Sequence, residues 1–310
     1  MQQVAAQESS RPPVAHLLVG MWLAWSTTLI AIKVGLRSAD PLSFSLLRVA
    51  LTTVVLGVFI LVVRHPPGDM STPTVRRHGL LAALGLTGVG GFMLLQTIGL
   101  RDAPVGVASV VLFSAPLAVA IGSRVLLGEV LTRRKVFGLM IGWIGVAVVV
   151  GVEVSAIGTS PLALLILFGA TLSWAANTLL YKAVDGLPSV VHVLFWSHVY
   201  SVLLLGLIVG FSGWRFAFDA TSSFAVVWAA LAGGIGGMGL MFWVLQRRPA
   251  GETSSYTFAV PVLAASFGIA LLGEPLHVGL VVGPVAVGVS VWLIGRDREV
   301  GGRPVVAVTP

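Results

Sequence analysis

Cysteine is absent from this 310-residue chain, and charge is scarce, since Asp, Glu, Lys and Arg together make up 10% of the residues. Without cysteine there is no disulfide framework, no thiol chemistry and no cysteine-based metal site. A water-soluble surface carries about 25–35% charged residues, so a soluble globular protein is excluded. Hydrophobic residues make up 56% of the chain, and the mean hydropathy is +0.98. Lipid is therefore the solvent for most of the surface.

Motifs for enzyme chemistry are also missing. The chain has no P-loop, no nucleotide fingerprint, no HExxH sequence and no credible nucleophile–base pair. His192 and His198 are six residues apart, which places them about 120° off a common helical face and makes them a poor metal pair. The net charge of +7 has no basic stripe on a polar domain to carry it. We therefore expect no enzyme activity, cofactor, metal site or nucleic-acid partner.

Long apolar runs are abundant. A helix of about 20 apolar residues crosses a hydrocarbon core about 30 Å thick. Ten such runs occupy roughly residues 14–35, 41–63, 79–100, 103–127, 134–152, 161–182, 188–211, 224–245, 252–272 and 277–295. The expected fold is an all-α membrane protein with ten transmembrane helices.

The distribution of Lys and Arg predicts the orientation of the chain. With the N-terminus inside, thirteen of these residues fall on the cytoplasmic side, four fall outside, and two lie within helices. Because cytoplasmic loops are enriched in Lys and Arg, both termini are expected in the cytoplasm, as tails of residues 1–13 and 296–310. No A-x-A cleavage pattern follows the first apolar run, so this run is expected to stay as a membrane helix.

Two stretches of the sequence occur twice. Pro116–Glu129 matches Pro261–Glu274 at six of fourteen positions, including the closing Leu-Leu-Gly-Glu. Leu23–Lys33 matches Leu172–Lys182, with Trp and Lys eight residues apart in both. The offsets, 145 and 149 residues, are close enough for a single duplication. Residues 14–152 and 161–295 are therefore predicted to be two copies of one five-helix unit.

An odd number of helices per copy has a topological consequence. The second copy must enter the membrane inverted, so that Lys33 ends a helix outside while Lys182 ends one inside. Inverted repeats are a transporter architecture, in which a site between the copies opens to either side. The sequence therefore indicates a carrier. An accessory or structural membrane protein is the alternative from another class.

Several of these motifs resemble a known family. Trp25 and Lys33 in the first helix, Pro41 and Arg48 in the second, and the paired Leu-Leu-Gly-Glu are similar to EamA-type members of the drug/metabolite transporter superfamily. The resemblance implies a bacterial inner-membrane carrier with a central cavity, usually an exporter of small metabolites such as amino acids. One departure is that the second half has no Arg matching Arg48.

Arg48 is the first candidate for the solute site. It lies seven residues inside its helix, about 10 Å along the axis. An Arg at that depth marks a site or an ion pair. In one interpretation it faces the cavity and binds a carboxylate or phosphate; in the other its stem reaches the interface and meets Asp40 or Asp102.

Other aromatic and polar residues within the helices extend the candidate cavity. Trp25 and Trp174 occupy equivalent positions in the two copies and are suited to wall a cavity, although ordinary packing is the alternative. Ser and Thr are often bonded to their own helix, whereas an amide in lipid needs a partner. The candidate cavity residues are Trp25, Thr28, Arg48, Gln96, Trp174, Asn177, His198 and Tyr256.

Every carboxylate that the sequence can place lies at a helix end or in a loop. A mid-membrane Asp or Glu, the usual proton relay and cation counter-ion, is missing, while His198 is placed to carry a proton or simply to pack. This absence favours neutral, zwitterionic or anionic solutes over hydrophobic cations. A multidrug or aromatic-compound exporter is the runner-up because of the nine Trp. Monomer and homodimer both stay open.

Four matched residues are assigned structural roles. Pro116 and Pro261 are expected to kink their helices, with hinging during transport as the alternative. Glu129 and Glu274 lie where their helices emerge, and we expect each to accept backbone or basic partners near the start of the next helix.

Overall fold

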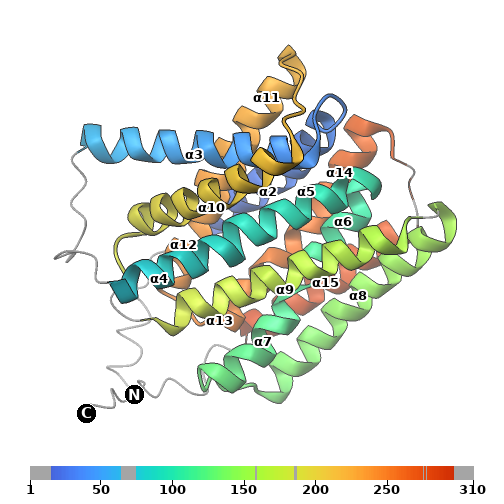
Figure 1. Cartoon of the computed structure of the whole chain (residues 1–310). Helices are drawn as coiled ribbons and strands as arrows, with labels where there is room; N and C mark the ends of the chain where they lie inside the picture. The colour runs from blue at the N-terminus through green and yellow to red at the C-terminus, as the bar shows by residue number, and fades with distance from the viewer. Residues whose placement is uncertain are drawn as a thin grey trace, which may run out of the picture.

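The computed structural model is a bundle of helices and describes residues 15–63, 75–157, 159–184, 187–274, 276 and 278–296 (Figure 1). Of the predicted tails, residues 1–13 and 297–310 lie outside this part, and Arg296 is the last residue of the final helix. The α-helices are α2 (Ala15–Gly35), α3 (Pro41–Val63), α4 (Val75–Leu84), α5 (Met93–Asp102), α6 (Val105–Leu112), α7 (Ala115–Leu126), α8 (Arg133–Ile157), α9 (Pro161–Ala183), α10 (Val190–Ser212), α11 (Ala220–Trp228), α12 (Met238–Leu245), α13 (Ala250–Ser255), α14 (Ala259–Leu272) and α15 (Gly279–Arg296). Two π-helical segments, η1 (Gly85–Phe92) and η2 (Ala229–Gly237), and the 3₁₀ turn η3 (Tyr256–Phe258) join some of them.

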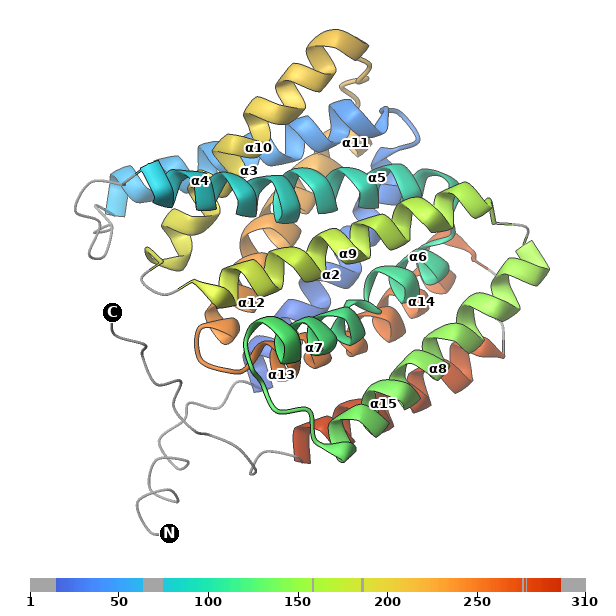
Figure 2. The same cartoon turned by 60° about the horizontal axis from the view of Figure 1, so that its bottom comes forward.

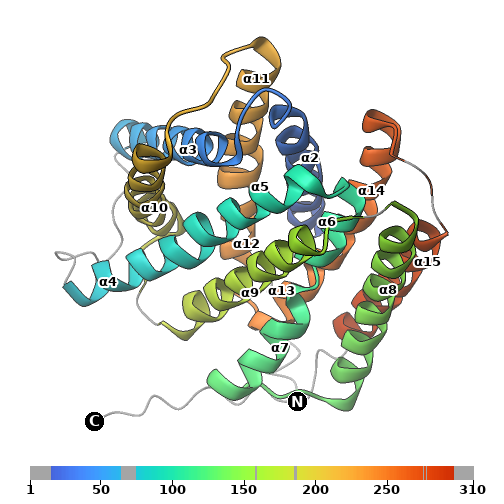
Figure 3. The same ribbon diagram turned by 45° about the vertical axis from the view of Figure 1, so that its right-hand side comes forward.

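Within the described residues, eight helical rods are long and apolar enough to cross a membrane. Four of these rods are composite, because α4–η1–α5, α6–α7, α11–η2–α12 and α13–η3–α14 each run as one span. The last predicted run of each half corresponds to α8 and α15, which are helical but are not among the eight. These two helices pack side by side along one flank of the molecule (Figures 2 and 3).

Glycines in η1 and η2 allow side chains of other helices to come close. A Cβ atom on Gly88 would lie 2.3 Å from Nδ2 of Asn177, and one on Gly233 would lie 2.8 Å from Cγ2 of Thr28. Asn177 and Thr28 are equivalent positions of the duplicated sequence. Small residues permit this close helix contact in membranes. Each half therefore inserts a polar side chain against the π-helical segment of the other half.

Hydrogen bonds between the halves also occur in two copies. The Thr52 hydroxyl donates to the Ala230 carbonyl at 3.2 Å, and the Ser201 hydroxyl donates to the Gly85 carbonyl at 2.9 Å. The donors are 149 residues apart and the acceptors 145, which are the two offsets of the sequence repeat. The duplication seen in the sequence is thus carried into matching contacts at the centre of the bundle.

Glu129 and Glu274 each hold the start of a helix. The carboxylate of Glu274 accepts the N–H groups of Val105, at 2.7 Å, and Gly106, at 3.2 Å, which open α6. Glu129 accepts the first two N–H groups of α13 in the same way, at 2.8 and 3.2 Å. The expectation that the next helix supplies the partner is wrong, because each Glu binds a helix of the opposite half. A carboxylate is stabilised there by unpaired N–H groups and the helix dipole.

Lysines complete the same two corners. Nζ of Lys33 donates to the carbonyls of Leu100, at 2.9 Å, and Ala103, at 2.8 Å, at the end of α5. Lys182 donates to the Leu245 carbonyl at the end of α12, at 3.0 Å. The orphan carbonyls at a helix C-terminus favour a cation. We call the Lys33–Glu274 and Lys182–Glu129 corners the two clasps; Figure 1 places α6 and α13, which they hold, at opposite ends of the bundle.

Pro116 and Pro261 follow the helix breaks rather than sit in helix interiors. Pro116 is the second residue of α7, after an interruption at Phe113 and Ser114, and Pro261 is the third residue of α14, after η3. In a first turn the missing N–H of proline has no intrahelical partner to lose. Each proline therefore begins the second segment of its rod, and the irregular backbone precedes it.

Candidate functional site

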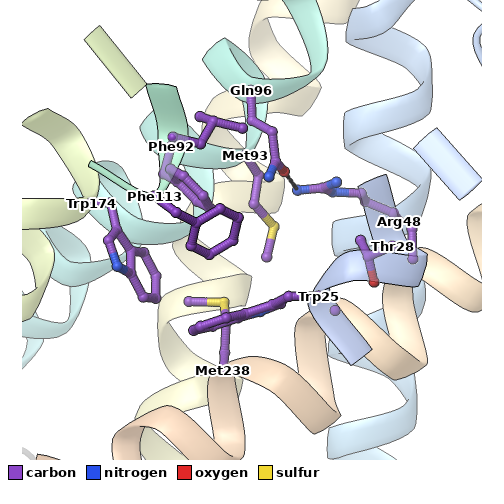
Figure 4. Close-up of a pocket in the computed structure, with 12 residues that line it drawn as sticks. Trp25, Thr28, Arg48, Phe92, Met93, Gln96, Phe113, Trp174 and Met238 are labelled. Atoms are coloured by element: carbon purple, nitrogen blue, oxygen red, sulfur yellow. Dashed lines mark hydrogen bonds between the residues drawn. The ribbon is translucent and has the colours of Figure 1, made fainter. Parts of the chain in front are cut away.

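Side chains from both halves surround a cavity at the centre of the bundle (Figure 4). It is small: only about 20 Å³ is open to the centre of a water molecule, enough for roughly one water. The protein is therefore closed around this point. The lining residues are Trp25, Thr28, Arg48, Phe92, Met93, Gln96, Leu112, Phe113, Trp174, Ala229, Gly233 and Met238.

Arg48 is the only charged residue that the described part of the chain contributes to this lining. Its side chain is 2% exposed, and Nη2 donates to the Gln96 carboxamide oxygen at 3.2 Å (Figure 4). Nε and Nη1 have no hydrogen-bond partner in the described part of the chain. The expected alternative of a pair with Asp40 or Asp102 does not occur, because one oxygen of Asp40 caps α3 and Asp102 is exposed beside Arg101.

A buried guanidinium without an acid is costly. Placing an Arg at the centre of a membrane helix costs about 2.5–3.5 kcal/mol even by insertion measurements, and unpaired buried donors add to the cost. Among the described residues, no Asp or Glu lines the cavity to offset the charge. The site therefore offers unfilled N–H donors and a net positive charge.

Four aromatic rings form the opposite wall. Trp25 and Trp174 meet edge to face with ring centroids 5.7 Å apart, Trp25 lies 5.8 Å from Phe113, and Trp174 lies 5.0 Å from Phe92. Such pairs are worth about 0.5–1.5 kcal/mol beyond the area they bury. The sequence repeat identified the two Trp. It missed the two Phe, because a Phe in an apolar run carries no signal that separates cavity from lipid.

The cavity includes five of the eight predicted residues and leaves out three. Asn177 is buried beside it and donates to a backbone carbonyl of α4 at 3.0 Å. Nδ1 of His198, a fully buried residue, pairs with a carbonyl of its own helix at 2.7 Å, and its Nε2 has no hydrogen-bond partner among the described atoms. The Tyr256 hydroxyl donates to Glu252 at 2.5 Å. Gly233 and Met238 line the cavity, and sequence reasoning did not propose them.

Gly237 supports the Trp25 indole and provides a steric test. A Cβ atom at this position would lie 2.2 Å from Nε1 of Trp25. Gly237→Ala is therefore expected to displace the ring, at about 1–3 kcal/mol for overpacking, and to reduce transport. Gly206→Ala, in α10 with nothing within 4 Å, is the matched control. Melting in detergent and solute flux measure both variants; equal behaviour of the two would contradict the packing described here.

Comparison with known proteins identifies the family. The profile of the EamA-like transporter family matches residues 13–151 and 161–296. This chain therefore belongs to the EamA-like transporter family, and it is a multi-pass membrane transporter rather than an enzyme.

Relatives and one solved structure agree with this assignment. Two relatives are 27% identical over 286 residues: the uncharacterized transporter YoaV of Bacillus subtilis, over 89% of this chain and 94% of the relative, and a probable terminal-alkyne amino-acid exporter of Streptantibioticus cattleyicolor, over 91% and 92%. The inner membrane transporter YedA of Escherichia coli, uncharacterized, is 26% identical, over 85% and 84%. One crystal structure superposes with a TM-score of 0.74 at 18% identity, over 94% of this chain and all of the other, which shows a common fold.

Proposed function

We propose that this member of the EamA-like transporter family is a secondary carrier of the bacterial inner membrane that exports small amphipathic metabolites, amino acids or similar solutes, by alternating access. The observation that carries the proposal is the closed central cavity, in which a buried Arg48 with unfilled donors faces aromatic rings contributed by both halves. A structural protein has no use for an unpaired buried charge at its centre.

The proposed architecture is ten helices in two inverted five-helix repeats, residues 14–152 and 161–295. Matched contacts between the halves support it, as do α8 and α15, which stand at equivalent places as the last helix of each half. The excess of Lys and Arg on one side supports cytoplasmic termini. The bilayer and the solute are the expected partners, with no nucleic acid, and the protein works as a monomer or homodimer.

The clasps suit an alternating mechanism. Each ties a helix start to the opposite half by charge-assisted hydrogen bonds, and the two lie at opposite ends of the bundle. With both clasps closed the cavity has room for about one water. Releasing one clasp while the other holds opens the site to one side only, which an inverted repeat requires.

The solute class follows from the lining and from the relatives. Arg48 and Gln96 offer hydrogen bonds to a polar head, while the aromatic rings and two Met accept an apolar body. One relative is named a probable terminal-alkyne amino-acid exporter, and an amino acid of that type has a polar head and an apolar body. The aromatic wall also suits a multidrug exporter, but the buried cation disfavours cationic drugs.

Cysteine labelling in this cysteine-free chain tests the carrier proposal. Thr28→Cys, in the cavity wall, is expected to react with a membrane-impermeant maleimide from either side of sealed vesicles, because alternating access exposes it in turn. Val58→Cys, 53% exposed on the outer surface of α3, is the control and is expected to stay unreactive in lipid.

Two outcomes would contradict the proposal. Labelling of neither variant indicates an accessory protein without a solvent-reachable cavity. Labelling of position 28 without counterflow, so that solute trapped inside vesicles does not accelerate tracer entry, indicates a passive channel.

A further inference from the structure

We infer that the solute of this carrier is a monoanion, a carboxylate with an apolar body and no ammonium group, and that its export carries net negative charge. This inference rests on the proposed carrier and its central site, and it departs from the amino acids of that proposal. It keeps the amphipathic metabolites that carry a carboxylate and excludes those with an ammonium group. It follows from the charged groups that line the central cavity. The shape of the cavity does not define the solute, because the cavity is closed around a space of roughly one water.

Arg48 has hydrogen-bond donors that a solute can fill. A guanidinium offers five N–H groups in a planar fork that matches a carboxylate. Gln96 occupies one of them, and Nε and Nη1 are buried without a partner among the described residues. The head of Arg48 points toward Gln96 at the cavity (Figure 4). An anionic ligand fills these donors and neutralises the charge, which neither a neutral solute nor a single water does.

An ammonium group on the solute would need a carboxylate partner in the cavity. A buried ammonium requires an acid or several acceptors, and none of the described residues that line the cavity is a carboxylate. Carboxylates with described contacts are engaged elsewhere, in helix caps, in an ion pair or at the surface: Asp40, Asp102, Glu129, Asp219, Glu252 and Glu274. The tryptophan faces attract a desolvated cation by about 2 kcal/mol or more, but they supply no acid, and Arg48 repels it. The site therefore favours the carboxylate and opposes the amine.

The cavity provides a cationic partner for one anionic group of the solute. By the offset that relates Thr52 to Ser201, the position of Arg48 in the second half is Ser197. The cation is therefore single, and the side of the cavity facing it carries Trp174, Phe92 and Phe113. A dicarboxylate would have to bury its second charge against these rings. A monocarboxylate places its apolar body there at no such cost.

Export of a monoanion has an energetic consequence. Moving one charge across 100 mV is worth about 2.3 kcal/mol, which corresponds to a gradient of about 50-fold at 1.36 kcal/mol per tenfold. With the cell interior negative, the potential drives an anion outward. A carrier of this class therefore needs no coupling proton, in agreement with the missing mid-membrane carboxylate of the sequence.

The experiment compares four solutes that share a phenyl body: 3-phenylpropanoate, phenylalanine, 3-phenylpropanamide and 2-phenylethylamine. The purified full chain is reconstituted in liposomes at pH 8, and protein-free vesicles correct for leak. Each solute, loaded inside, is tested for counterflow of labelled 3-phenylpropanoate. The carboxylate is expected to exchange at least tenfold better than the zwitterion, the amide and the amine. In the Arg48→Gln variant this preference is expected to disappear, and Arg48→Lys is expected to keep part of it.

A potassium diffusion potential set with valinomycin tests whether transport moves net charge across the membrane. Vesicles with a positive interior are expected to accumulate the carboxylate toward about 50-fold at 100 mV, and reversing the potential is expected to reverse the direction. Equal or better exchange of phenylalanine or phenylethylamine overturns the inference and leaves the carrier proposal standing. If accumulation of the carboxylate is independent of the membrane potential and follows a pH gradient, the proposed movement of net charge is wrong. If none of the four exchanges, the inference fails, and two-sided labelling of position 28 decides whether the carrier proposal fails as well.

Discussion

Replacing Arg48 with Met is expected to abolish transport while making the empty protein more stable. Most substitutions of a residue that is 2% exposed destabilise. Here the wild-type side chain buries a charge with two unpartnered nitrogens, and no acid among the described residues lines its cavity. Met fills similar space without that cost, and replacing buried ionic groups by apolar ones is often stabilising by about 1–4 kcal/mol.

Stability is expected to rise in this variant, whereas transport is expected to fall by a large factor. Removing one partner of a buried, hydrogen-bonded charge interaction costs about 2–5 kcal/mol, which is about 30-fold or more in transport efficiency. Initial rates in liposomes and thermal melting in detergent measure the two effects on the same preparation. Arg124→Met, on the exposed face of α7, is the control and is expected to change neither.

Increased stability together with lost transport in Arg48→Met is the result that supports the role of Arg48. If Arg48→Met melts at a lower temperature than the wild type, the guanidinium is already satisfied in the empty protein. The charge inventory of the cavity would then be wrong. If stability rises and transport is unchanged, Arg48 has no part in binding the solute.

Removing the clasp carboxylates is expected to open the protein on opposite sides. Glu274→Ala leaves the N–H groups that begin α6 without acceptors, and Glu129→Ala does the same at α13. Each Glu makes two hydrogen bonds to backbone N–H groups, and bonds of charged groups contribute about 1.5–3 kcal/mol each. A loss of about 3 kcal/mol is enough to shift a closed–open equilibrium by about 150-fold.

The test combines each Glu variant with Thr28→Cys. In the proposed topology Glu274→Ala is expected to increase maleimide labelling from outside the cell, and Glu129→Ala from the cytoplasm. Glu→Gln substitutions keep one acceptor oxygen and are expected to have smaller effects. Asp219→Ala removes another helix cap, the carboxylate that accepts the Ser222 N–H at 2.7 Å, and serves as the control. Increased labelling from the same side in both Glu variants would refute the assignment of one clasp to each mouth.

Local composition predicted much of the fold. Each apolar run predicted from the sequence corresponds to a helical rod, because hydropathy reports the solvent that a segment faces, and this property is encoded residue by residue. The duplication was readable because paired motifs such as Leu-Leu-Gly-Glu persist at fixed offsets. The π-helical segments were not predicted, because the side chains that pack against their glycines, Thr28 and Asn177, lie more than 85 residues away in the sequence.

Some residues of the candidate site were also predictable from the sequence, and others were not. Arg48, Gln96 and the paired Trp were identifiable because a polar or matched aromatic residue is unexpected within an apolar helix. Phe92, Phe113 and Met238 were not, because an apolar side chain has the same sequence signal whether it faces lipid or a cavity. His198 and Asn177 are as polar as the cavity residues, but they point to partners outside its lining.

By itself, the sequence determined that this is a duplicated helical membrane protein with an arginine deep in its second helix, because hydrophobicity, charge and repetition are properties of the chain. Only the tertiary structure decided that this arginine has no acid beside it in the described part of the chain, and that Glu129 and Glu274 each bind a helix of the opposite half. The reason is physical: hydrogen-bond partners and counter-ions are chosen by positions in space, after helices distant in the sequence have packed together.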